Sequence, residues 1–339
     1  AGDQWEEALW ICGQSAFDYR RHVAQTATAT ALYCTSQLFP QGGLYILGDG
    51  DRQMVVDVGS HGQKGNGGHA HNDTLSFTLS ALGNPWLVDP GSYLYTADFV
   101  ERNRFRATAY HNTVQVDESE MTPTDPLALF RLEADLLPTV KCWADDQVST
   151  LLIAEHAGYA RLPDPVHHRR LFWLDKTTGT WIVQDQMMGM AHHNLAWHWH
   201  FAATVNVTID SMPSSLDLGS TGMVAALACR DREANDDTAL AMIAFNSSAL
   251  PFTLEEGWIS PGYGLRTPAM ILRLAQEAVQ LPYSLTMAFV PLASPAALTT
   301  QLIAEIDDRW QQFVGQQRAT VDASRSQPTV ETNHHAHAQ

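Results

Sequence analysis

The sequence predicts an all-β protein built as one large antiparallel β-sandwich, preceded by a short helical segment. From Leu44 onward, β-rich runs of apolar residues are separated by glycine, proline, asparagine and aspartate. These runs follow one another with few helical segments between them, and strands connected in this way form antiparallel sheets that pack face to face. The chain has 339 residues, of which 45% are hydrophobic, which is enough for a large core.

Residues 1–35 are predicted to form the helical segment and a link to the sandwich, which is expected to cover residues 36–315. Apolar side chains of the first segment recur at helical spacing, at Trp5, Ala8, Leu9 and Cys12. The period changes near Leu44, where strand-like runs begin.

Two stretches at the start of the sandwich carry the signature of a β-hairpin. The first, GGLYILGDGDRQMVVDVG at residues 42–59, has a Gly-Asp-Gly turn between two apolar runs. The second, TLSFTLSALGNPWLVDPGSYLY at residues 74–95, turns at Gly83 and Asn84. Similar runs continue along the chain to about residue 292, so most of the sequence is expected to be strand.

Helices are expected in only two other places, at about residues 97–107 and 295–316. The last segment, residues 316–339, is polar and aperiodic, and it is predicted to be a disordered tail. Three histidines near its end are expected to be solvated: His334, His335 and His337.

Composition and charge exclude several classes of protein. The formal net charge of −17 argues against a nucleic-acid or membrane-surface binder, and no apolar run is long enough to span a membrane. The chain begins at Ala1 and shows no signal peptide. The four cysteines form no CxxC pair and are expected to be buried free thiols: Cys12, Cys34, Cys142 and Cys229.

The stretch NGGHAHNDTLSF, residues 66–77, is the first candidate for a functional site. In a strand, alternate side chains share one face, so His69, His71 and Asp73 would point the same way. Leu75 and Phe77 would continue this face into apolar surroundings. The pattern therefore predicts a strand that leaves a cleft and enters the core.

Two further residues join this stretch as candidates for a metal site. Asp89 ends the apolar run in WLVDPGSY, and His111 begins another in AYHNTVQVD. Two imidazoles and one carboxylate are a normal ligand set for zinc. The alternative is that each histidine is separately satisfied by hydrogen bonds. For His198 and His200 in WHWHF, ordinary strand alternation with packed tryptophans is the favoured interpretation.

The segment GSYLYTADFVERNRFRATAY, residues 91–110, concentrates tyrosines and arginines in an otherwise acidic chain. Arginine binds carboxylate or sulfate through two parallel hydrogen bonds, and tyrosine can act as an acid or base beside a positive charge. Alternatively, the arginines are structural and pair with Asp98 and Glu101.

Taken together, these stretches resemble the C-terminal β-sandwich domain of the heparinase II/III-like polysaccharide lyases. The succession GHxHND, VDPG and HNTV carries the resemblance, supported by GGLYILGDGDRQMVVDVGSHG and EEGWISPGYGLR, and it covers roughly residues 36–290. Members of this family typically place an α/α toroid before the sandwich. The resemblance implies that the toroid is almost wholly missing here, with residues 1–35 as its last remnant.

The resemblance also implies a function and a role for each candidate residue. The expected activity is β-elimination in an acidic, uronate-containing polysaccharide, with a toroid as partner in the same protein and a periplasmic or extracellular location. His69 resembles the catalytic or carboxylate-neutralising histidine of the family. The zinc site of the family matches His71, Asp89 and His111, which would hold one Zn²⁺ ion that organises the cleft.

From the chemistry of the reaction, we expect three further residues to contribute. Tyr95 is the candidate acid–base tyrosine, and Arg104 and Arg106 are the candidates for binding the substrate carboxylate. Two other classes of protein stay open at this point. One is a non-catalytic carbohydrate-binding β-sandwich, and the other is a cupin-like metal enzyme, which also carries His-x-His followed by a carboxylate and a later histidine.

Overall fold

The computed structural model describes residues 34–62, 66–133, 135–209, 222–230, 237–245 and 250–325. The helical segment expected over residues 1–35 lies outside the described residues, apart from its last two, which begin the first strand. The predicted tail is outside them from residue 326 onward.

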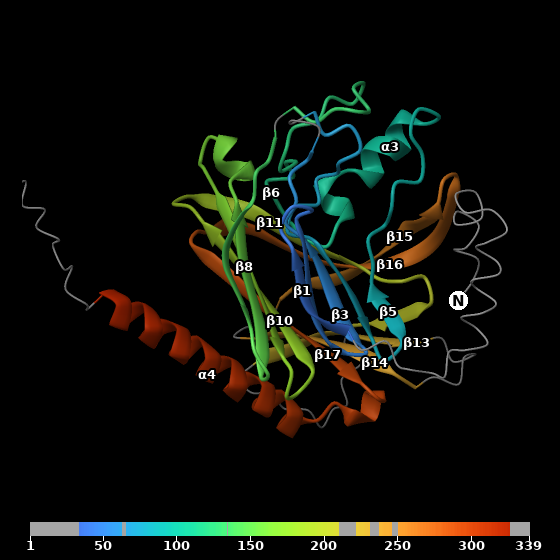
Figure 1. Cartoon of the computed structure of the whole chain (residues 1–339). Helices are drawn as coiled ribbons and strands as arrows, with labels where there is room; N and C mark the ends of the chain where they lie inside the picture. The colour runs from blue at the N-terminus through green and yellow to red at the C-terminus, as the bar shows by residue number, and fades with distance from the viewer. Residues whose placement is uncertain are drawn as a thin grey trace, which may run out of the picture.

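Three antiparallel sheets make up the described part of the chain, which confirms the predicted all-β sandwich (Figure 1). The five-stranded sheet has the order β1-β2-β3-β4-β5, with bounds Cys34–Phe39, Leu44–Gly50, Arg52–Asp57, Phe77–Ala81 and Asn84–Leu87. The four-stranded sheet has the order β15-β16-β11-β6, with bounds Phe252–Gly262, Leu265–Gln280, His192–His200 and Val114–Val116.

The eight-stranded sheet has the order β12-β13-β14-β17-β10-β9-β8-β7. Its strands, in the same order, are Val205–Thr208, Gly222–Arg230, Ala239–Phe245, Tyr283–Leu292, Thr180–Met188, His167–Asp175, Ser149–His156 and Thr139–Asp145. The sheets are open, and consecutive strands pair mainly as hairpins, so the architecture is a sandwich and not a cupin barrel.

Both predicted hairpins are confirmed. β2 pairs with β3 in a register that places Leu47 opposite Met54, and Gly50 adopts the positive φ of 64° that the tight turn requires. β4 pairs with β5 across the turn that contains Gly83.

The expected strand at residues 66–76 is wrong, because this segment is an irregular loop between β3 and β4. Its backbone bonds to other segments instead of to a neighbouring strand: the Asn72 amide donates to the Arg106 carbonyl at 2.9 Å, and the Leu75 amide donates to the Asp57 carbonyl at 2.9 Å. Leu75 also has a positive φ of 63°, which lies outside the extended conformation of regular strands. The strand begins only at Phe77.

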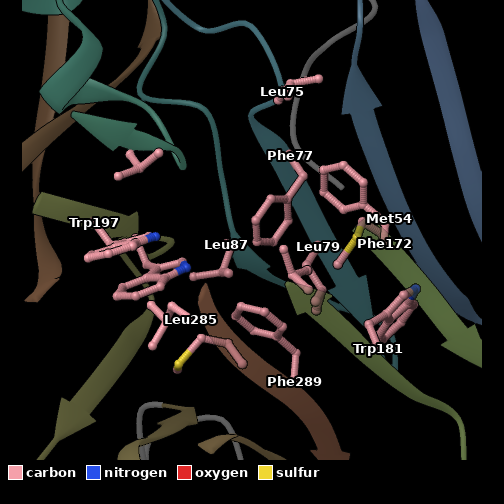
Figure 2. Packing of buried hydrophobic residues seen from close by; sticks show 14 of the residues in the cluster. Met54, Leu75, Phe77, Leu79, Leu87, Phe172, Trp181, Trp197, Leu285 and Phe289 are labelled. Atoms are coloured by element: carbon pink, nitrogen blue, oxygen red, sulfur yellow. The ribbon is translucent and has the colours of Figure 1, made fainter. Parts of the chain in front are cut away.

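One large core lies between the sheets and contains buried residues from Tyr45 to Phe289. Phe77 of β4 meets Phe172 and Phe289 of the eight-stranded sheet, with ring centroids 5.9 and 5.4 Å apart (Figure 2). Trp197 of the four-stranded sheet belongs to the same cluster. The three sheets therefore share one core, which is not divided near the middle of the chain.

Two α-helices lie in the described part of the chain, α3 at Phe99–Phe105 and α4 at Thr300–Arg325. In Figure 1, α4 runs along the eight-stranded sheet, far from α3 and the long loops. Its residues Trp310 and Phe313 pack on Trp173, forming a second apolar cluster on the outer face of that sheet. No described helix is long and apolar enough to cross a membrane.

Both predicted helices are thus present, but the predicted boundary at residue 316 is wrong, since α4 continues to Arg325. The helix is held by more than apolar contacts. Arg309 forms an ion pair with the buried carboxylate of Asp175 at the end of β9, with a second hydrogen bond from Nη2 to Oδ1 of 2.7 Å.

Replacing Arg309 with alanine should lower the free energy of unfolding by about 1–2 kcal/mol, because the lost hydrogen bonds go to a charged and buried group. Burial opposes ionisation of Asp175, but its hydrogen bonds with Arg309 outweigh this and lower its pKa. Because the pKa of Asp175 is lower in the folded than in the unfolded protein, its ionised carboxylate stabilises the fold at pH values above the unfolded-state pKa. This contribution is lost as the pH falls through the folded-state pKa. Urea unfolding of both proteins should therefore show a difference at pH 7 that shrinks below about pH 4. A difference that grows on acidification would contradict this role.

Candidate active-site cleft and metal site

The candidate site lies at the end of the sandwich that carries α3 (Figure 1). The β3–β4 loop supplies His71 and Asp73, and the segment between a 3₁₀ turn at Thr108–Tyr110 and β6 supplies His111. One potential ligand atom from each of these three residues lies within 4.8 Å of the other two. Segments about 40 residues apart in the sequence therefore meet in one cluster of nitrogen and oxygen donors.

Asn112 fixes the segment that carries His111. Its buried side-chain amide donates to the carbonyls of Phe77, at 2.7 Å, and Val88, at 3.0 Å. Its side-chain oxygen accepts from the His200 amide at 2.7 Å. These bonds join β4, the end of β5 and β11, so they hold His111 against both neighbouring sheets.

Arg170 of β9 connects the segment that carries His111 to the β3–β4 loop. Its Nη1 donates to the carbonyl of Leu75 at 2.7 Å and to that of Asn112 at 2.8 Å. Its Nε and Nη2 bind both oxygens of Asp185, at 2.6 and 2.9 Å. The carboxylate of Asp185 is also approached by His168 at 2.6 Å, so the whole arrangement is a buried polar network inside the sandwich.

The donor set suits a divalent cation. His71 and His111 are buried, and Nε2 of His111 has no hydrogen-bond partner among the described residues. Burial, followed by the charge of His111, lowers the pKa of His71 to about 3, so its imidazole is neutral. Burial also raises the pKa of Asp73. Histidine nitrogens beside a half-buried carboxylate are ligands that zinc prefers.

Asp89, expected as the carboxylate ligand, is not one of the three clustered residues; Asp73 takes that place. Asp89 lies beside the cluster, with Oδ2 at 2.8 Å from Nδ1 of His111, and its Oδ1 accepts from the Gly91 amide at 2.8 Å. The proximity of Asp89 to His111 makes it a candidate fourth donor. Arg102 donates to Nε2 of His71 at 2.8 Å, so a metal ion bound at this nitrogen requires Arg102 to move.

His69 lies outside the cluster and is exposed. It lines an open pocket together with Asp57, Ser60, His61, Gly59, Ala70 and Asp73. Burial and then the charge of Asp73 raise the pKa of Asp57 in this pocket to about 6. The ring of His69 contacts Tyr95 and Phe130 edge-on, with both centroid distances at 5.9 Å. Tyr95 is therefore the tyrosine in ring contact with His69.

The arginines of α3 occupy three different environments. Arg104 is exposed and pairs with Glu101 at 2.8 Å. Arg106 is 1% exposed, and its guanidinium donates to Asn103 and to the carbonyls of residues 125, 128 and 131. The expected substrate-binding role of Arg106 is therefore wrong, because all three of its guanidinium nitrogens donate hydrogen bonds within the protein and none is left for a substrate. Arg102, for which no substrate-binding role is predicted, lies beside His71 instead.

His198 and His200 of β11 are both buried. Burial, followed by the charge of Arg273, lowers the pKa of His198 to about 4. His200 contacts the ring of Tyr110, with centroids 5.3 Å apart, and neither of its ring nitrogens has a partner among the described residues. The predicted alternation of packed tryptophans holds, since Trp197 and Trp199 are buried in the main core.

The fold and site define a β-sandwich with a histidine–carboxylate cluster at one end. A family model described as "Heparinase II/III-like, C-terminal" matches residues 35–301, so the chain belongs to this family. No curated protein matches the sequence.

Solved structures with the same fold include heparan sulfate lyase HepC from Pedobacter heparinus, with a TM-score of 0.61 and 19% identity over 85% of this chain and 41% of that one. A heparinase III structure has a TM-score of 0.60 and 16% identity over 78% of this chain and 38% of its own. The chain thus spans about two fifths of the length of these relatives.

Asp73→Asn and Asp89→Asn should each weaken zinc binding by at least about tenfold, because the first removes a charged donor from the cluster and the second removes the charge beside His111. Isothermal titration of the metal-free chain with zinc measures the effect. His193→Ala is the matched control, since His193 forms a similar pair with Asp117, at 2.7 Å, outside the cluster. Unchanged affinity in Asp89→Asn would remove Asp89 from the ligand set, and unchanged affinity in Asp73→Asn would remove Asp73.

Proposed function

We propose that the chain is the C-terminal part of a polysaccharide lyase that cleaves a uronate-containing glycan by β-elimination. The observation that carries the proposal is the position of His69. It is exposed, lines an open pocket and contacts Tyr95, and Asp73 of the donor cluster lines the same pocket. Its neighbours thus hold the ring in place and leave one side open to a substrate.

β-Elimination needs three groups around the uronate ring. The C5 proton is removed, the C4–O4 bond breaks, a C4–C5 double bond forms, and the departing O4 takes up a proton. Because the C5 proton is only weakly acidic beside a charged carboxylate, the enzyme must also neutralise that carboxylate. In this proposal His69 neutralises it, and Tyr95, whose ring contacts His69, exchanges protons at C5 or O4.

His71, Asp73 and His111, with Asp89 beside them, are the residues that would hold a zinc ion. When bound, the ion would add positive potential behind His69 and fix the loop ends in register. The chain's own contribution is the network of Asn112 and Arg170, which fixes the two segments that carry these ligands. Arg104 is the exposed arginine available to an acidic group of the substrate.

The proposal includes a partner and a location. The relatives are more than twice as long as the matched region, which supports an N-terminal α/α toroid in the same protein that completes the cleft. The substrate is then an acidic polysaccharide bound between the two domains, and the protein acts in the periplasm or outside the cell. The chain alone should bind glycan weakly and cleave slowly or not at all.

A substrate screen tests the proposal. The full-length protein is incubated with heparan sulfate, alginate, a bacterial uronate exopolysaccharide and neutral dextran, and the ultraviolet absorbance of the unsaturated product is followed. Absorbance should rise with at least one uronate glycan and not with dextran. Binding of glycans without any rise in absorbance would instead support a non-catalytic carbohydrate-binding sandwich.

A further inference from the structure

Two exposed aromatic rings, Phe130 and Tyr263, pack around Tyr95 beside His69 and have no role in the function described above. Tyr263, at the tip of the β15–β16 hairpin, stacks on Tyr95 with ring centroids 5.8 Å apart and an interplanar angle of 25°. Phe130 packs on Tyr95 at 5.7 Å and on His69 at 5.9 Å. Tyr95, Phe130 and Tyr263 are called the aromatic shelf below.

The outer ring of the shelf is open to solvent. Tyr263 is 66% exposed although one of its faces lies on Tyr95, so its other face is free to receive a ligand. Phe130 is 40% exposed. An aromatic ring of this kind offers an apolar face together with a polar tip, and both suit the mixed surface of a sugar ring.

The hairpin that presents Tyr263 is fixed to the site and does not extend freely into solvent. The Gly264 amide donates to the Tyr93 carbonyl at 2.9 Å, and the Ser260 amide donates to the Pro90 carbonyl at 2.7 Å. The Trp258 amide donates to the Tyr110 hydroxyl at 3.2 Å. Three bonds thus hold the hairpin to the segment that links Asp89 and His111, and this places Tyr263 beside the site.

The shelf also has cationic neighbours in a chain of net charge −17. Arg266 lies over the ring of Trp258, at 4.3 Å from its centroid, and pairs with Glu101 at 2.8 Å. Arg104 pairs with the other oxygen of Glu101. Two arginines share one carboxylate, so this trio keeps one positive charge beside the hairpin that carries Tyr263, where it can attract a carboxylate or sulfate group.

We infer that the aromatic shelf is a glycan subsite next to the reacting sugar, in which Tyr263 stacks on the ring of an acidic saccharide and Arg266 faces its anionic group. The inference rests on the proposed lyase function and adds a substrate-contacting residue to it. Tyr263 contacts Tyr95 and not His69, so it is a substrate-binding residue and not a catalytic residue.

Affinity electrophoresis of the 339-residue chain in gels that contain heparan sulfate, alginate or neutral dextran tests the inference. Tyr263→Ala should weaken binding of the retained acidic glycan by about tenfold, the scale of one lost stacking contact. Tyr263→Phe keeps the ring and should restore most of the affinity. Leu265→Ala is the control, because Leu265 is exposed on the same hairpin and belongs neither to the shelf nor to the cluster.

The outcomes distinguish failure of the subsite inference from failure of the proposed lyase function. Unchanged glycan affinity in Tyr263→Ala would overturn the subsite, and so would a wild-type chain that binds neither acidic glycan. Loss of self-association in Tyr263→Ala, with glycan affinity intact, would assign the shelf to a contact between copies of the chain and would also overturn it. Loss of glycan binding in Tyr263→Ala, with no unsaturated product from any uronate glycan, would support the subsite and contradict the lyase.

Discussion

Replacing His69 with alanine in the full-length protein should lower kcat on its uronate substrate by about a hundredfold or more. A positioned acid–base or charge-stabilising group contributes on this scale. His69 is exposed and lines the pocket, and it is not one of the residues of the donor cluster. The zinc content and the melting temperature of the variant should therefore stay at the wild-type values, and initial rates from product absorbance measure the change.

His167→Ala is the matched control for this variant, because His167 is also an exposed histidine but begins β9 and does not line the pocket. It should retain wild-type rates. Full activity in His69→Ala would remove His69 from the reaction. A parallel loss of zinc from His69→Ala would show that it acts as a ligand, which contradicts the separation of roles proposed for His69 and His71.

Replacing Arg170 with methionine should lower the free energy of unfolding by about 3–5 kcal/mol, because it leaves the buried carboxylate of Asp185 without its cation. Burial raises the pKa of Asp185, but Arg170 outweighs this effect and keeps the pKa well below its ordinary range. The variant also leaves the carbonyls of Leu75 and Asn112 without their donor. Zinc affinity should fall by about tenfold or more, the usual effect of losing support behind a metal ligand.

Two measurements separate positioning from general stability. Arg309→Ala breaks an ion pair far from the cluster, so it should reduce stability and leave the zinc affinity unchanged. The double variant Arg170→Met, Asp185→Leu removes both charges and should recover part of the stability but none of the zinc affinity. If Arg170→Met binds zinc as tightly as the wild type in its folded state, Arg170 has no positioning role.

The sequence was most informative where a local rule determines the structure. The turns at Gly50 and Gly83 predicted two hairpins, and both are present, because tight turns with positive φ select glycine. The histidines at the mouths of β-rich runs predicted a cluster, and His71 and His111 do converge. The resemblance of the HND, VDPG and HNTV stretches also led to the correct family.

The errors arise where distant segments decide the conformation. Strand alternation placed His69, His71 and Asp73 on one face, but the β3–β4 loop bonds to the end of α3 and to Asp57. As a result His69 lines the pocket, His71 belongs to the donor cluster, and Asp73 belongs to both. Arg106 was expected at the substrate because nothing local shows that its acceptors lie about 20 residues later in the chain.

Arg170 and Asp185 were missed, although a signal exists. Each is a charged residue within an apolar strand, and they face each other in the register of β9 and β10. A pair of opposite charges in adjacent apolar strands is expected to bond across the sheet, since an unpaired charge cannot be buried. Recognising the pair needs the register of β9 and β10, which the sequence alone does not supply.

The fate of water in the reaction tests the central claim most directly. The full-length protein is incubated with its uronate glycan in water labelled with heavy oxygen, and the products are examined by mass spectrometry. β-Elimination forms the C4–C5 double bond without adding water, so in an incubation short enough to limit exchange of the reducing-end oxygen the account predicts unsaturated products that carry no label. Saturated products with heavy oxygen at the newly formed chain end would show hydrolysis and would contradict it.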